Sequence, residues 1–149
     1  MKLKIGQLVF DSPLIQAPLA GYSCAPMRKL AHQYGGLAYS CTEMLSAQHI
    51  FSGGRQKRRF SYKDPDEGLV CFQLAGNNPT ILAEACRKSL SWGADLIDLN
   101  CGCPQPKIRK KNIGSRLLDN PDKLYQLIIA MKKSVDIPVT VKIRVDGHS

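Results

Sequence analysis

The stretch ADLIDLNCGCP, residues 94–104, decides the fold. Its first seven residues form a short apolar run of the kind found in a buried strand, and the run leads directly into a Cys-Gly-Cys-Pro segment. Four similar runs lie at 14–18 (LIQAP), 36–44 (GLAYSCTEM), 69–76 (LVCFQLAG) and 139–145 (VTVKIRV). Helical patterns separate these runs, and such alternation is typical of βαβ units that build a parallel sheet.

Three segments between the runs carry helix signals. Asn78-Pro79 and Asn120-Pro121 each combine an N-cap residue with a proline in the first turn. Another helix is predicted to follow Ser23 and to stop at Gly35-Gly36. The apolar positions expected to face the core are Met27, Leu30, Ala31 and Tyr34 in the first helix, Leu82, Ala85, Cys86 and Leu90 in the second, and Leu124, Leu127, Ile128 and Met131 in the third.

The spacing of the runs favours a barrel. Five units in 149 residues give about 30 residues each, so eight would need about 240, close to the ~250 of a (β/α)8 TIM barrel. We therefore predict an α/β fold with about the first five β/α units of such a barrel in one domain. A doubly wound open sheet is the alternative, although no Gly-x-Gly-x-x-Gly follows the first run.

Charge and composition narrow the function classes. Lys and Arg total 21 against 12 Asp and Glu, a net charge of +9 that favours an anionic partner, with nucleic acid as the leading candidate. The 44% hydrophobic and 22% charged residues exclude global disorder. The sequence shows neither an apolar run of membrane-spanning length nor a secretory leader, so we expect a cytoplasmic protein without membrane contact.

The six cysteines are expected to be reduced, and most to be buried small hydrophobes. Cys101-x-Cys103 is a weak metal signal, because structural zinc sites need four ligands and no second close Cys or His pair exists. We predict no metal. Cys103, at a strand end beside cations, is better suited to acid–base or nucleophilic chemistry.

Strand alternation predicts which polar side chains meet. In a parallel barrel the active site lies at the C-terminal ends of the strands. Lys142 and Arg144 share one face of the run 139–145. Asp98 and Asn100 share one face of the run 94–100, and Gln73 lies on the corresponding face of the run 69–76. These side chains are therefore expected at one mouth, where a polar ligand could satisfy them.

Simpler interpretations remain open for the same residues. Lys142 and Arg144 could lie on a solvated edge strand, and Gln73 and Asn100 could only bond backbone at strand ends. Glu43 is expected to cap a local turn or helix. The basic segments 107–116 (KIRKKNIGSR) and 55–63 (RQKRRFSYK) are either solvated loops or phosphate contacts.

Six motifs together resemble the tRNA-dihydrouridine synthase family. They occur in the family's order: APLAG (17–21), TEM (42–44), FQL (72–74), DLNCGCP (98–104), GSRLL (114–118) and VKIR (141–144). That family has an FMN-containing (β/α)8 barrel followed by a small helical domain, and it reduces uridines of tRNA to 5,6-dihydrouridine with NADPH. The resemblance implies that residues 1–149 are the N-terminal part of such an enzyme's barrel domain, without the remaining strands and the C-terminal helical tRNA-binding domain.

The resemblance also implies roles for the flavin. Pro18, Leu19 and Ala20 match the segment whose backbone lies along the flavin ring, and Gln73 and Lys142 match side chains that bind the isoalloxazine. A buried, fixed ammonium of Lys142 near the N1/O2 edge would stabilise the negative charge of the reduced flavin.

Further roles concern the substrate. Cys103 matches the catalytic acid, which would protonate C5 of the uracil after hydride delivery to C6. Asn100 matches a substrate-contacting residue, and Arg144 would help to hold the base or the flavin. The cations expected to contact the tRNA backbone are Lys107, Arg109, Lys110 and Lys111.

Two features depart from the family pattern. Gly21-Tyr22-Ser23-Cys24 lacks the Asp that often follows the first strand, and the sequence stops after the fifth run. The alternatives are therefore an inactive half-barrel, which could self-associate through open sheet edges, or a flavin barrel for free pyrimidines resembling dihydroorotate dehydrogenase.

Overall fold

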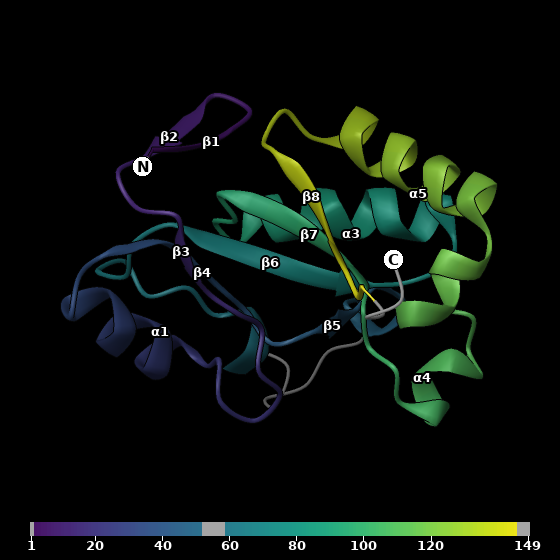
Figure 1. Cartoon of the computed structure of the whole chain (residues 1–149), viewed down its shortest axis with the longest axis horizontal. Helices are drawn as coiled ribbons and strands as arrows, with labels where there is room; N and C mark the ends of the chain where they lie inside the picture. Colours follow the sequence, from purple (N-terminus) through teal and green to yellow (C-terminus); the bar gives the residue numbers. More distant parts are fainter. Residues whose placement is uncertain (1, 52–58, 146–149) are drawn as a thin grey trace.

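The computed structural model describes residues 2–51 and 59–145 and shows a parallel half-barrel, like the start of a TIM barrel (Figure 1). The predicted fold class is therefore confirmed. Strand order follows the sequence, and every neighbouring pair is parallel. The strands are β3 (Leu14–Gln16), β4 (Leu37–Cys41), β6 (Val70–Ala75), β7 (Leu96–Cys101) and β8 (Val139–Ile143).

Two long helices cover the outer face of the sheet. They are α3 (Pro79–Ser91) and α5 (Pro121–Ser134), which pack side by side (Figure 1). The predicted caps are confirmed: the Asn78 side chain accepts a hydrogen bond from Ile81 N, and the Asn120 side chain accepts one from Lys123 N. Most of their predicted apolar positions form the main core with Phe72, Leu74, Ile97 and Leu99 from the strands. The prediction is wrong for Leu90, which is 42% exposed.

The helix α1 (Ala25–Gln33) differs from the sequence prediction. Cys24 rather than Ser23 occupies its N-cap, without a side-chain cap bond. The predicted apolar face is wrong, because Met27, Leu30 and Tyr34 are 41%, 48% and 85% exposed. The buried face instead carries Arg28, whose charge is neutralised by an ion pair described below.

The inner face of the sheet has its own small core. Cys41, Cys71 and Leu96 pack there against Phe10 from a hairpin formed by β1 (Leu3–Ile5) and β2 (Leu8–Phe10). This hairpin was not predicted, because two three-residue strands give too short a periodic signal. It covers the end of the half-barrel at which the strands begin. The polar side chains lie at the opposite mouth, where the strands end.

Short elements surround that mouth. The strand β5 (Leu45–Ser46) and the 3-10 helix η1 (Ala47–His49) follow β4, while α4 (Pro106–Arg109) and the 3-10 helix η2 (Gly114–Asp119) follow β7. All of them therefore lie where a parallel barrel carries its functional loops.

The two edge strands expose apolar side chains. In the described part of the chain, β3 pairs only with β4 and β8 only with β7. Leu14 on β3 is 62% exposed and Ile143 on β8 is 52% exposed. Self-association through these edges stays a prediction. Within residues 2–51 and 59–145, every helix is too short or too polar to span a lipid bilayer.

Candidate functional site

A cavity of about 660 Å³ opens at the C-terminal ends of β6, β7 and β8. Because parallel strands place these ends together, side chains far apart in sequence meet there. Met44 and Ile108 form part of its wall. The predicted site residues around the cavity are Pro18, Ala20, Gln73, Asn100, Cys103, Lys107, Lys142 and Arg144.

Four other predicted site residues do not line this cavity. Leu19 is 49% exposed, and Lys110 is exposed on the short helix. Arg109 donates hydrogen bonds to Ser115 Oγ at 2.9 Å and Asp119 Oδ2 at 3.5 Å. Lys111 lines a second cavity instead. In the basic segment 55–63, residues 55–58 lie outside the described part of the chain.

A hydrogen-bond relay crosses the strand ends. Thr140 donates to Asp98 Oδ1 at 2.8 Å, and Gln73 Nε2 donates to Asp98 Oδ2 at 2.7 Å. Asn100 Nδ2 donates to Gln73 Oε1 at 2.8 Å, and Cys103 N donates to Asn100 Oδ1 at 3.1 Å. The relay therefore connects β8, β7 and β6 to the backbone of Cys103.

The relay fixes the orientation of both amides. A carboxylate only accepts hydrogen bonds, so Asp98 forces Gln73 to turn its NH₂ toward it and its oxygen toward Asn100. Asn100 must then turn its own oxygen toward Cys103 N. Asn100 bonds backbone at the strand end and also lies on the cavity wall, while its contact with a substrate stays a prediction.

Burial raises the pKa of Asp98, while hydrogen bonds from Gln73 and Thr140 and the charge of Lys142 oppose that shift. Asp98 was not among the predicted site residues. Its place on the inner face beside Asn100 was readable from strand alternation, but its contact with Gln73 depends on the register of β6 and β7.

The loop that carries Cys103 is held closely from two sides. Ser115 N donates to the Cys103 carbonyl at 3.0 Å, and Arg144 Nε donates to the Gly102 carbonyl at 3.1 Å. Gly114 has φ +67°, and a Cβ there would approach the Cys103 carbonyl oxygen to 2.7 Å. Cys103 itself is half-buried and lines the cavity.

Lys142 lines the cavity but is exposed, so the expected buried ammonium is wrong for this chain. The reason is its position on β8, an edge strand in the described structure. Arg144 is exposed as well. The edge-strand interpretation therefore holds for Lys142, whereas Arg144 lies just after the end of β8; both residues also line the cavity.

The loop after β3, which brings Pro18 and Ala20 to the cavity, is tied down by Ser23. Its hydroxyl accepts from Leu19 N at 2.8 Å and donates to the Ala17 carbonyl at 3.2 Å. Glu43 accepts from Gly21 N at 2.6 Å, so it holds a loop 22 residues earlier rather than the local turn or helix predicted.

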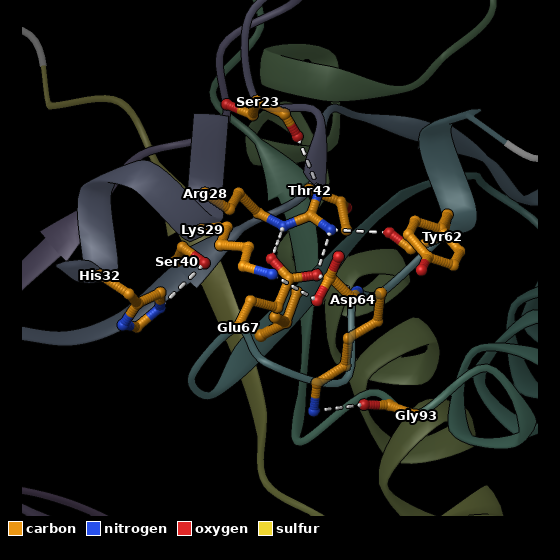
Figure 2. A network of polar contacts seen from close by, with 12 residues as sticks. Ser23, Arg28, Lys29, His32, Ser40, Thr42, Tyr62, Asp64, Glu67 and Gly93 are labelled. Carbon is orange, nitrogen blue, oxygen red and sulfur yellow. Dashed lines mark hydrogen bonds and ion pairs between the residues drawn. The ribbon is translucent and has the colours of Figure 1, made fainter. Parts of the chain in front are cut away.

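An ion-pair network anchors the same loop from beneath (Figure 2). Arg28 and Glu67 are wholly buried and share two hydrogen bonds of 2.9 and 2.8 Å. Arg28 also donates to the Ser23 carbonyl at 2.8 Å and the Tyr62 carbonyl at 2.7 Å. Sequence reasoning missed this pair, since the residues lie 39 positions apart.

The cavity is electropositive. Lys107, Lys142 and Arg144 line it, and no Asp or Glu of the described chain does so. Such a wall attracts an anionic ligand. Among the same described residues, no three His, Cys, Asp or Glu side chains are arranged to hold a metal ion.

The comparisons with known proteins agree with this arrangement. The family model described as "Dihydrouridine synthase (Dus)" matches residues 15–149. tRNA-dihydrouridine synthase B of Vibrio vulnificus is 39% identical over 144 residues, and that of Yersinia pestis is 40% identical over 144 residues. Each match covers 95% of this chain but 44% of the relative, so the chain spans less than half of either curated protein.

A solved structure supports the architecture alone. Histamine dehydrogenase from Rhizobium sp. 4-9 aligns with a TM-score of 0.66 over 95% of this chain and 33% of that chain, at 15% identity. At that identity the likeness shows the fold and not the activity. The family match and the two synthase relatives carry the assignment: the chain belongs to the dihydrouridine synthase family.

Proposed function

We propose that the chain is the N-terminal part of an FMN-dependent enzyme that reduces uridine to 5,6-dihydrouridine in tRNA with NADPH. The observation that carries the proposal is the cavity at the strand ends, where a half-buried thiol, Cys103, lies among cations and oriented amides. Family membership and the synthase relatives support the same activity. The rest of the barrel and a helical tRNA-binding domain would complete that protein.

The cavity suits a flavin mononucleotide. Its volume of about 660 Å³ is within the usual range for ligand pockets of ~300–1,000 Å³. After its two relay bonds, Gln73 retains one N–H and one oxygen lone pair for a heteroaromatic ring. Pro18 and Ala20 present the loop backbone, and Lys142 supplies a cation beside the ring. When bound, FMN would supply the two-electron redox chemistry.

Cys103 would hold a proton at Sγ and transfer it to C5 of the uracil. Cys103 N donates to Asn100 in the relay, and the Cys103 carbonyl accepts from Ser115 N. Both backbone polar groups of Cys103 are therefore held in place. The proton donor would therefore be placed before the substrate binds.

The cations of the segment after β7 would bind RNA unequally. Lys107 and Lys110 are exposed and have no ion pair in the described structure, so they are available for phosphates. Arg109 is already engaged by Ser115 and Asp119. We therefore propose that Arg109 mainly stabilises its own loop and contributes less to RNA binding than Lys107 and Lys110 do.

The test of this function is a Cys103→Ala variant, with Cys24→Ala as the matched control at another half-buried thiol. Flavin binding is followed by absorbance, flavin reduction by NADPH consumption, and dihydrouridine by mass spectrometry of unmodified tRNA. Cys103→Ala should keep flavin reduction and lose dihydrouridine, whereas Cys24→Ala should keep both. Retained dihydrouridine formation in Cys103→Ala would remove the thiol from the acid role.

Exposed apolar side chains on β3 and β8 favour a second candidate, an inactive half-barrel that self-associates. In that case the purified chain would carry no flavin, aggregate, and leave tRNA unchanged. A flavin barrel for free pyrimidines would instead reduce or oxidise a free base as efficiently as the tRNA. A free pyrimidine added to the NADPH assay in place of tRNA would separate this third function from the other two.

A further inference from the structure

A second cavity of about 450 Å³ lies beside the candidate site. Its walls come from the segments that follow β4, β6 and β7, so it opens at the same mouth of the half-barrel. Met44 and Ile108 line both cavities and thus form the ridge between them.

The walls of this second cavity are fixed without a ligand. Asn77 Nδ2 donates to the Lys111 carbonyl at 2.8 Å, which ties the segment after β6 to the segment after β7. The third wall is the segment after β4, in which a hydrogen bond of 3.0 Å joins Ser46 Oγ and His49 Nδ1 and stiffens the chain. A cavity bounded by cross-linked loops loses little conformational freedom when it is filled.

The chemistry of the walls suits a nucleotide. Lys111 provides a cation, and no carboxylate of the described residues lines the cavity, as in the first one. Gln48 and Asn77 provide amides, which bond the edges of unpaired bases, while Ile81 and Ile108 provide apolar surface for a ring. Lys107 lines one cavity and Lys111 the other, so a cation stands on each side of the ridge.

We propose that this second cavity binds the nucleotide adjacent to the target uridine on the same RNA strand. The inference rests on the proposed function, in which the target uracil would enter the first cavity beside the flavin. A flipped-out uridine must be accompanied by a distorted strand, and single-stranded RNA is recognised by splayed bases in separate pockets. The Met44–Ile108 ridge would separate the two bases.

The experiment uses this chain and an RNA stem-loop with one target uridine in its loop. 4-Thiouridine replaces either the target or one of its two neighbours, and ultraviolet crosslinks are mapped by mass spectrometry. The label at the target should reach residues 100–107, and the label at one neighbour should reach 46–49 or 75–78. If the target label reaches 100–107 but neither neighbour reaches those segments, the second-cavity proposal is wrong. If the target label misses 100–107, the proposed function fails together with it.

A charge-matched pair of variants gives an independent measure. Lys111→Gln keeps the backbone carbonyl that Asn77 binds, and Lys133→Gln removes the same charge from the far end of α5. Loss of one phosphate contact with single-stranded RNA lowers the salt slope by ~0.7, about fivefold in affinity at 0.1 M salt. Lys111→Gln should show this loss and Lys133→Gln should not. An equal loss of RNA affinity in both variants would mean that removing any positive charge has this effect, wherever it lies. That result would overturn the proposal.

Discussion

The relay at the strand ends makes a sharp prediction for Gln73→Glu. The change is nearly isosteric but replaces the Nε2 donor, which lies 2.7 Å from Asp98 Oδ2, with a carboxylate oxygen. Two charges at that distance repel by ~6 kcal/mol at an effective dielectric constant of ~20. The new carboxyl should therefore keep its proton in the folded protein, and its O–H then replaces the lost donor.

The loss of unfolding free energy depends on the pH, because the folded protein must keep the new carboxyl at position 73 protonated. The unfolded chain releases this proton at a pKa of ~4.3, so holding it costs ~1.4 kcal/mol for each pH unit above that value. The expected loss of unfolding free energy is ~1 kcal/mol at pH 5, ~3.7 kcal/mol at pH 7 and ~5 kcal/mol at pH 8. The sign follows from the raised folded-state pKa: stability is retained at low pH and lost as the pH rises.

Urea unfolding at pH 5, 7 and 8, followed by the fluorescence of the single tryptophan, Trp92, measures this directly. Gln126→Glu, at an exposed position of α5, is the matched control and should show no such trend. A difference between Gln73→Glu and the native chain that is equal at pH 5 and pH 8 would refute the relay as described.

Three further predictions follow from buried contacts. Arg28→Met leaves Glu67 charged and unpaired, so urea unfolding should show a loss of ~3–5 kcal/mol, most of it recovered in the double variant with Glu67→Met. Gly114→Ala places a Cβ against the Cys103 carbonyl and strains the backbone, so the free energy of unfolding should fall by at least ~1–2 kcal/mol. The rate of Cys103 alkylation should also change, and an unchanged rate would contradict the close contact. Burial raises the pKa of Cys71 well above its usual value and that of Cys101 to about 12, so iodoacetamide at pH 8 should label Cys103 in the folded chain and leave these two for the unfolded chain, as peptide mass spectrometry would show.

Much of the framework could be predicted from local patterns. Apolar runs and Asn-Pro caps identified the five parallel strands and two of the helices, because these signals act within a few residues. Alternation along β7 also placed Asp98 and Asn100 on one face, since the period of a strand is fixed by its backbone.

Local patterns failed where distant segments decide the environment. The sequence pattern of α1 indicated a buried Met27 and Leu30, but the structure buries Arg28, because Glu67 arrives from 39 residues away to neutralise it. Glu43 was expected to act locally, yet it binds the loop after β3. In both cases a long-range hydrogen bond outweighs the local sequence pattern.

By itself, the sequence determined the alternation of strands and helices, the positive charge and the place of Cys103 after a strand. Only the tertiary structure decided how the site is held. The register of β6 against β7 brings Gln73 between Asp98 and Asn100, and the edge position of β8 leaves Lys142 exposed. Strand register and sheet edges are set by pairing between distant segments, which no local pattern encodes.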